Sequence, residues 1–162
     1  MEHVIKLLIV DDETRFLNAI AQRLTKRGFD VRTAENGKDA IQLARSEKFD
    51  IALLDLRMPG MDGGEVLRVL KEEHQFLEAI ILTGHGSLES AVELTKLGAY
   101  SYLPKPYELE KLIQVLQEAY QARLRKKFAS DQATMEKIMT LAEGESPLGI
   151  LRKLRELDDN RK

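Results

Sequence analysis

One stretch constrains the fold of this chain more than any other. Residues 51–54, Ile-Ala-Leu-Leu, form an apolar run without a polar face, and Asp55 follows directly. A strand of this kind is buried on both sides, which is typical of a parallel sheet covered by helices. Open sheets of that type hold their ligands beyond the carboxyl ends of the strands. Asp55 is therefore the first candidate functional residue.

Strand-like and helix-like segments alternate along the first 120 residues. Apolar residues recur at helical spacing between the strands, and a longer helical pattern starts near Glu108. Crossovers between parallel strands are right-handed and place each helix on a face of the sheet. The pattern predicts an α/β fold, a doubly wound five-stranded parallel sheet with helices on both faces. The predicted strands are 6–10, 30–34, 51–54, 79–83 and 100–104.

Composition narrows the class of protein. With 162 residues and 43% apolar content, we expect one domain with an appendage. The absence of cysteine excludes disulfides and thiolate metal sites. No segment approaches the roughly 18 apolar residues that a membrane span needs, and no signal peptide precedes the first strand. A cytoplasmic protein without membrane contact is expected.

Polar residues stand where four of the predicted strands end. Asp11 and Asp12 follow the first strand, Asp55 the third and Lys105 the fifth, while Thr83 is the last residue of the fourth. Because the carboxyl ends of parallel strands meet at one edge of a sheet, we expect these side chains to converge. Taken singly, each has a structural explanation as a cap, a strand end or a surface lysine. Their joint placement favours a functional site.

The chemistry of this group indicates a metal. Three carboxylates close together repel one another unless a cation offsets their charge. Mg²⁺ suits such a set, because it binds through one or two carboxylates and completes its shell with water and phosphate oxygen. An aspartate can attack phosphorus once a metal and a lysine neutralise the transferring group. The sequence therefore predicts a magnesium-dependent phosphoryl site.

The sequence resembles the receiver domain of two-component response regulators. The resemblance covers about residues 1–120 and implies the strand order 2-1-3-4-5 of a flavodoxin-like sheet. It implies a receiver domain over 1–121 and a helical extension over 122–162 without a recognisable output domain. The matching motifs, in the family's order, are Leu8-Ile-Val-Asp-Asp-Glu13, Leu53-Leu-Asp-Leu-Arg-Met-Pro-Gly-Met-Asp-Gly63, Ile81-Leu-Thr-Gly84 and Tyr102-Leu-Pro-Lys-Pro106.

The resemblance implies how the acidic residues act. Asp55 would be the phosphoacceptor, taking a phosphoryl group from a phosphohistidine on a sensor histidine kinase or a phosphotransfer protein. Asp12 and Asp55 would bind Mg²⁺ directly, Asp11 would act through water, and the backbone carbonyl of Arg57 would also contact the metal. Lys105 would pair with the phosphoryl oxygens. The peptide bond between Lys105 and the following proline is expected to be cis.

The resemblance also implies a switch. Thr83 would sense the phosphoryl group through its hydroxyl, and Tyr102 would move inward in response. The remodelled surface, formed by the fourth helix, fifth strand and fifth helix, would control a protein interaction or dimerisation. Arg57 and His85 occupy the family positions two residues after the phosphoacceptor and the sensor. We expect them to tune the lifetime of the phosphoryl group.

The last 40 residues continue the helical pattern. We expect the fifth helix to run on to about Ala142, to end at Gly144, and a short last helix to begin at Ser146-Pro147. Its apolar face needs a partner. Dimerisation along the extended helix is the first alternative, docking back on the receiver the second and another protein the third. DNA binding is not expected, because no helix-turn-helix spacing accompanies the basic residues Arg123, Arg125, Lys126 and Lys127.

The main competing class is a magnesium-dependent phosphohydrolase with an aspartyl nucleophile, of the haloacid dehalogenase type. That family needs a second aspartate two residues after the nucleophile, where this chain has Arg57. A flavodoxin-like cofactor binder is disfavoured, because Asp11, Asp12 and Glu13 would repel the cofactor's phosphate. The sequence thus predicts a signalling switch rather than an enzyme, acting on a downstream protein that the sequence does not identify.

Overall fold

The structure is a computed structural model that describes residues 4–55, 63–84, 88–141 and 145–160. Helices follow strands in regular alternation up to the fifth strand, and three helices follow it. In chain order the elements are β1 (Lys6–Val10), α1 (Thr14–Lys26), β2 (Asp30–Ala34), α2 (Gly37–Ser46), β3 (Ile51–Asp55), α3 (Gly63–Glu73), β4 (Glu78–Thr83), α4 (Leu88–Lys96), β5 (Ser101–Pro104), α5 (Leu109–Lys127), α6 (Gln132–Thr140) and α7 (Pro147–Asn160).

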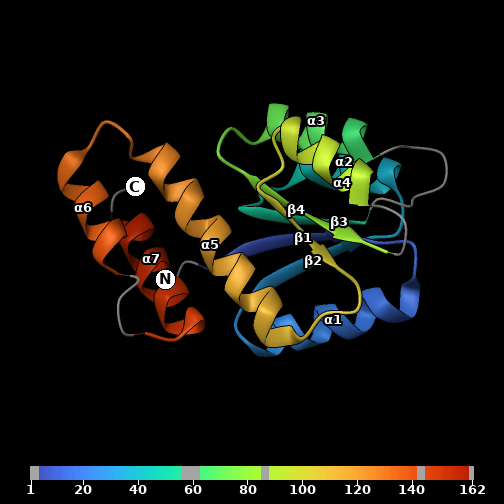
Figure 1. The fold of residues 1–162 in the computed structure, drawn as a ribbon, viewed down its shortest axis with the longest axis horizontal. Helices are drawn as coiled ribbons and strands as arrows, with labels where there is room; N and C mark the ends of the chain where they lie inside the picture. The colour runs from blue at the N-terminus through green and yellow to red at the C-terminus, as the bar shows by residue number, and fades with distance from the viewer. Residues whose placement is uncertain (1–3, 56–62, 85–87, 142–144, 161–162) are drawn as a thin grey trace.

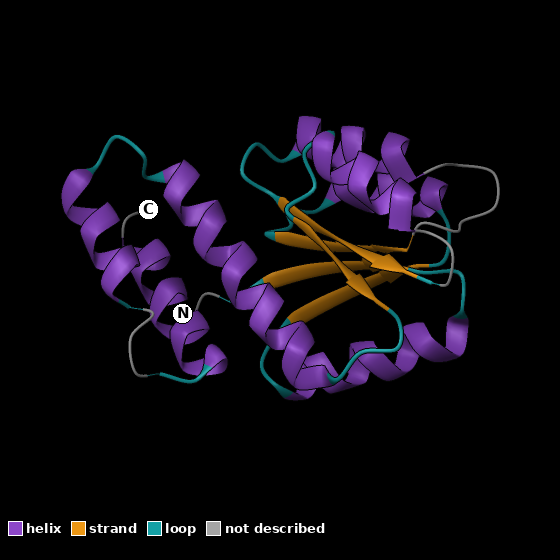
Figure 2. Ribbon diagram, viewed as in Figure 1, coloured by secondary structure: helices purple, strands orange, loops and turns teal. Residues whose placement is uncertain are grey.

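The five strands form one parallel sheet in the order β2-β1-β3-β4-β5. Helices α1 and α5 cover one face, and α2, α3 and α4 cover the other (Figure 1 and Figure 2). The predicted doubly wound sheet is confirmed, including its strand order.

Central strand β3 explains why its sequence has no polar face. Ile51 and Leu53 belong to the apolar core under α1 and α5, whereas Ala52 and Leu54 belong to the core under α2 and α3. All four side chains are fully buried. Successive side chains of a strand point to opposite faces, so a strand covered on both sides needs an apolar residue at every position.

The strand register brings the functional candidates to one edge. Val10 lies level with Leu54, so Asp11 and Asp55 end neighbouring strands at the same height. On the far side of β3, Thr83 is paired with Pro104, directly before Lys105. The parallel pairing therefore fixes which polar residues can meet.

Local signals at the helix ends are mostly as expected. Gly28 and Gly98 follow α1 and α4 with positive φ angles of 97° and 117°, a conformation that glycine adopts without a side-chain penalty. Asn36, expected within a turn, is the N-cap of α2 and accepts a hydrogen bond from the N–H of Asp39. The Lys105–Pro106 bond is cis, as predicted. The expected terminator Gly144 lies outside the described residues.

The fifth helix does not continue to Ala142, and that prediction is wrong. α5 ends at Lys127, and a turn leads into the separate helix α6. The reason is Asp131, whose carboxylate accepts hydrogen bonds from the N–H and the hydroxyl of Thr134. A side chain that satisfies the first amide groups of a new helix favours a fresh start over continuation.

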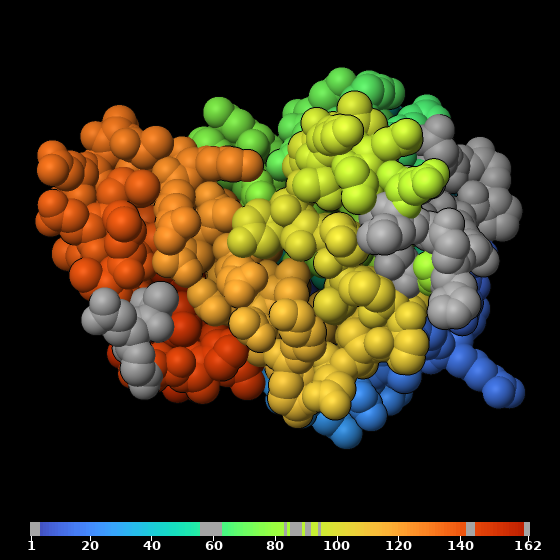
Figure 3. All heavy atoms as spheres, in the orientation of Figure 1, coloured from blue at the N-terminus to red at the C-terminus, as the bar shows by residue number. Residues whose placement is uncertain are grey.

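Helices α6 and α7 pack back on the chain's own α5. They contribute Ile138, Ile150, Leu151 and Leu154 to the core that also holds Tyr120 of α5. Figure 1 shows both helices beside the far end of α5, away from the carboxyl ends of the strands, and Figure 3 shows them as a lobe continuous with the rest of the surface. Docking back, the second of the three alternatives, covers the tail's apolar face. The expected boundary between residues 121 and 122 falls inside α5.

Two ion pairs join α5 to the amino-terminal edge of the sheet. Arg123 Nη2 lies 2.9 Å from Asp50 Oδ1, and Lys126 Nζ lies 2.8 Å from Glu78 Oε1. Both carboxylates are buried, with residue exposures of 7% and 1%. Pairs of this kind add little net stability, but removing one partner is costly because a buried charge is left alone. They therefore fix the position of α5 on the sheet.

A third contact joins α5 to α7. Asp158 is fully buried and accepts hydrogen bonds from Lys127 Nζ at 2.6 Å and from the Tyr120 hydroxyl at 2.9 Å. Burial alone would raise the pKa of Asp158, but these two hydrogen bonds and the nearby positive charges outweigh it and lower the pKa. The tail is thus held by a charged contact inside its apolar interface.

These contacts reassign the basic residues at the end of α5. Arg123, Lys126 and Lys127 each pair with a buried carboxylate, so they are structural and do not form a solvated basic face. Within the described residues, no helix is long and apolar enough to cross a membrane.

We predict that Asp158→Asn lowers the free energy of unfolding by about 3 kcal/mol near neutral pH, because the charge opposite Lys127 is lost from a buried site. The pKa of Asp158 is below its ordinary value of 3.8 when folded. Its contribution is therefore complete above that value and is lost as the pH falls towards the folded pKa. Urea denaturation across the acid range should show the gap between parent and variant closing.

Glu156→Gln, an exposed change on the same helix, serves as the control and should follow the parent at every pH. A gap between Asp158→Asn and the parent that is absent at neutral pH, or that widens in acid, would contradict the assignment.

Candidate functional site

The predicted acidic residues meet at the carboxyl edge of the sheet. Asp11 and Asp12 follow β1, and Asp55 is the last residue of β3. One carboxylate oxygen from each lies within 4.8 Å of the other two. Asp11 and Asp55 are buried, with exposures of 0% and 4%, whereas Asp12 is exposed. The group is thus open to solvent on one side only.

Lys105 brings a positive charge into this group. Its Nζ lies 2.6 Å from Asp11 Oδ2, 3.6 Å from Glu13 Oε1 and 3.9 Å from Asp55 Oδ2. Burial would lower the pKa of Lys105, but the hydrogen bond to Asp11 and the neighbouring carboxylates outweigh it, so the pKa is raised. The ammonium group therefore stays charged and lies between Asp11 and Asp55.

An aromatic pair supports Lys105 from the side. Lys105 Nζ lies 4.3 Å from the centre of the Phe16 ring, within the range of a cation–π contact. Tyr107 packs against Phe16 edge to face: the two ring centres are 5.9 Å apart, and the angle between the ring planes is 88°. The Tyr107 hydroxyl is buried with no hydrogen-bond partner among the described residues, and burial raises its pKa. This hydroxyl therefore stays protonated.

The sequence analysis missed this pair. Neither Phe16 nor Tyr107 is among the site residues predicted from the sequence. A signal was available, because Tyr107 follows Lys105-Pro106 directly and Phe16 lies one helical turn beyond Asp12. Aromatic residues placed so close to a lysine on a strand end are candidates for holding its ammonium group.

The donor atoms fit a hard divalent cation. Among the described residues, the candidate metal ligands at this edge are carboxylate oxygens, the kind that Mg²⁺ prefers. Lys105 neutralises only part of the charge of the three aspartates. Asp11 is already engaged, since Oδ2 accepts from Lys105 and Oδ1 accepts from the N–H of Glu13 at 2.9 Å. Asp11, Asp12 and Asp55 together form a group that could hold a metal ion.

The other predicted site residues are placed less completely. Thr83 ends β4 at the expected edge, but its side chain lies outside the described part. Arg57 and His85 also lie outside it, so their expected contacts are not tested. Tyr102 is on β5 with 36% of its surface exposed.

Comparison with known proteins agrees with this arrangement. The model of the response regulator receiver domain matches residues 7–117. GlrR, a transcriptional regulatory protein of Escherichia coli, is 36% identical over 134 residues, which are 83% of this chain and 30% of that protein. The DNA-binding transcriptional regulator NtrC of the same species is 35% identical over 68% of this chain and 24% of its own length.

Solved structures agree as well. A CheY-like receiver domain protein from Methanospirillum hungatei has a TM-score of 0.72 and 29% identity, over 76% of this chain and 99% of that chain. NtrX from Brucella abortus has a TM-score of 0.74 and 29% identity, over 83% of this chain and 30% of that chain.

This chain belongs to the response regulator receiver family.

The receiver match ends at residue 117, inside α5. This chain spans 30% or less of the length of the two curated relatives named above. The ion pairs that anchor α5 come from residues 123–127 and therefore lie beyond the matched receiver.

We predict that Phe16→Leu lowers the pKa of Lys105, because the aliphatic side chain removes the ring that faces the ammonium group while keeping the core filled. Titration of the Lys105 Cε resonance by NMR measures it. Phe128→Leu is the matched control, since Lys127 Nζ lies 5.4 Å from the centre of that ring, in the tail. An unchanged Lys105 pKa in Phe16→Leu would show that Asp11 alone holds the ammonium group.

Proposed function

We propose that this receiver accepts a phosphoryl group on Asp55 from the phosphohistidine of a sensor histidine kinase or phosphotransfer protein, and acts as a cytoplasmic signalling switch. The observation that carries the proposal is the joint position of Asp11, Asp12 and Asp55 around one point, with Lys105 Nζ 3.9 Å from Asp55 Oδ2. Membership of the receiver family supports it.

Asp12 and Asp55 would hold Mg²⁺, Asp11 would act through water, and the backbone carbonyl of Arg57 would complete the protein's contribution. When bound, the metal supplies positive charge that offsets the carboxylates and the phosphoryl oxygens. An Asp55 oxygen then forms the bond to phosphorus while the donor imidazole nitrogen leaves with its electron pair. The residues of this chain fix the nucleophile and its charge, and the donor supplies the group that is transferred.

Lys105 would stabilise the transferred group. Its ammonium can reach an oxygen bonded to Asp55 with a small movement away from Asp11, because it lies between the two. Phe16 holds the side chain from one side throughout. A positive charge already beside the nucleophile needs little reorganisation to stabilise the developing anion.

The response would pass through Thr83 and Tyr102. Thr83 would bond a phosphoryl oxygen, and Tyr102 would turn inward from its present, partly exposed position. Arg57 and His85 would tune how long the phosphoryl group persists. A switch needs an element with two arrangements that the new charge biases, and β5 provides an exposed aromatic residue beside the site.

The surface of α4, β5 and the start of α5 is the proposed output. Among the side chains that the structure describes, Val92, Leu97 and Tyr102 are the large apolar ones exposed there, with exposures of 40%, 68% and 36%. The second half of α5 is covered by α6 and α7. A partner protein or a second copy of the chain would therefore bind the first half of α5 together with α4 and β5. Residues 1–121 would act as the receiver and 122–162 as its helical extension.

We predict that acetyl phosphate with Mg²⁺ adds one phosphoryl group to the intact protein, detected by mass spectrometry, because the nucleophile and its neutralising charges are already assembled. Asp55→Asn should abolish the modification, and chelation of Mg²⁺ should do the same.

Asp30→Asn, a surface change at the opposite edge of the sheet, is the matched control and should be modified like the parent. Modification that persists in Asp55→Asn would remove Asp55 as the acceptor. Rapid catalytic release of phosphate in place of a stable adduct would favour the aspartyl phosphohydrolase alternative.

We predict that Mg²⁺ with beryllofluoride, which mimics the phosphoryl group, converts the protein from monomer to dimer in light scattering. Leu97→Lys should prevent the change by placing a charge on the proposed surface. Met139→Lys on α6, also an exposed apolar residue at 61%, should dimerise like the parent. An unchanged mass for the parent would rule out the homodimer and point to another protein as the target.

A further inference from the structure

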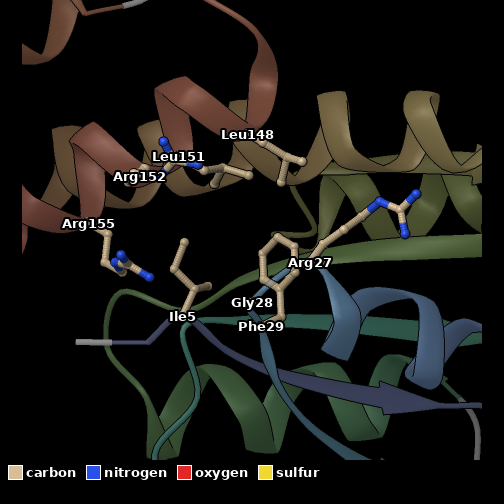
Figure 4. Close-up of a pocket in the computed structure, with 8 residues that line it drawn as sticks. All are labelled: Ile5, Arg27, Gly28, Phe29, Leu148, Leu151, Arg152 and Arg155. Atoms are coloured by element: carbon tan, nitrogen blue, oxygen red, sulfur yellow. The ribbon is translucent and has the colours of Figure 1, made fainter. Parts of the chain in front are cut away.

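A small cavity lies where α7 packs against the amino-terminal edge of the sheet. It has a volume of about 80 Å³, enough for several water-sized groups. Ile5 and Phe29, at the starts of β1 and β2, form one wall, and Leu148 and Leu151 of α7 form the other (Figure 4). Because these residues precede the strands, the cavity is at the opposite edge of the sheet from Asp55.

Three arginines line this cavity and no acidic residue does. Arg152 and Arg155 come from α7, and Arg27 is the C-cap of α1. None of the three has an ion pair within the described residues, and Arg27 Nη1 donates only to the backbone carbonyl of Arg23. Guanidinium groups without an ion pair at a partly enclosed site attract anions.

The neighbouring hollows differ in charge. The one lined by Tyr107 holds Arg23 and Arg27 but also Glu108 and Glu110, so its charges balance. In the hollow beside β3, the acidic lining residues include Asp50, which pairs with Arg123. The cavity under α7 differs from both in that no acidic residue lines it and none of its arginines has an ion pair among the described residues, whereas Arg45, Arg123 and Lys127 in the hollow beside β3 each have one.

We propose that this cavity binds a small oxyanion, inorganic phosphate or a compact phosphomonoester, between α7 and the α1–β2 turn. Arg155 points towards Ile5 across the cavity, whereas the Arg27 guanidinium points away from α7 (Figure 4). Arg155 is therefore the principal ligand, and Arg152 and Arg27 join it by rotating their long side chains. The apolar walls face the non-polar part of an ester.

The size and the donors decide the ligand class. A guanidinium group presents paired N–H donors that match the oxygens of phosphate. A partly open cavity of about 80 Å³ is too small to enclose a nucleotide, so the proposed ligand is a phosphate group with at most a short substituent. Ordering three long side chains costs conformational entropy, so the affinity is modest. A bound anion would hold α7 to the sheet edge and so stabilise the tail.

The test is a titration of the full chain with inorganic phosphate at constant ionic strength, followed by amide NMR. Chelator is present throughout, so that the acidic residues at the other edge repel the probe. We expect saturable shifts at Gly28, Phe29 and residues 148–155. Ethyl phosphate, titrated in parallel, distinguishes the ester from the free ion, because only the ester contacts the apolar walls and should bind more tightly if it is the ligand.

Arg152→Ala with Arg155→Ala should weaken phosphate binding by about tenfold or more, and Arg125→Ala, an exposed arginine of α5, should leave it unchanged. Thermal unfolding with and without phosphate gives a second readout, in which the parent gains stability and the double variant does not. Shifts that are spread over all basic residues, that never saturate, or that persist in the double variant would overturn the proposal. This result is independent of whether Asp55 is phosphorylated.

Discussion

Repulsion between carboxylates at the end of the sheet is the constraint on which the rest of the structure depends. Asp11 and Asp55 are almost completely buried and share one ammonium group, with Asp12 beside them. Charges of the same sign at this distance are unfavourable in a poorly solvated site. The parallel register holds them together, because β1 and β3 end level with each other. The core on both faces of β3 therefore supplies the stability that such a site lacks.

The two edges of the sheet treat charge in opposite ways. At the amino-terminal edge, Asp50 and Glu78 each have a basic partner from α5, so their negative charges are neutralised. At the carboxyl edge, Lys105 contacts Asp11 and Asp55 but is a single positive charge beside three aspartates, so negative charge remains. Neutralised ion pairs fix geometry, whereas clusters with an excess of negative charge attract cationic ligands. This difference distinguishes a structural edge from a chemical one.

The sequence predicts the sheet and most of the site because both follow from local patterns. The continuous apolar pattern of residues 51–54 predicts a strand buried on both faces, and the parallel sheet then brings Asp11, Asp55 and Lys105 together. The tail follows from contacts that no local pattern contains. Asp158 reads as a polar residue of an amphipathic helix, and only packing against α5 shows that Tyr120 and Lys127 bind it. Glu78, the one charged residue of β4, was the available clue to such a contact.

Helix α5 connects the two edges of the sheet. Its first turn comes shortly after Lys105 and Tyr107 in the chain. The Tyr107 ring contacts the Phe16 ring, and the Phe16 ring contacts the Lys105 ammonium group. Its last turns carry Arg123 and Lys126, which are tied to the opposite edge. A helix of 19 residues spans about 28 Å, and bending it would cost free energy, so it moves as a rigid unit. Separating either ion pair would remove the α5 partner of a buried carboxylate. A displacement at the first turn therefore tilts α5 about its anchored end, and α6 and α7, packed on that end, move least. In the proposed switch, the surface of α4, β5 and the first half of α5 would therefore move most, and the tail would be the fixed point.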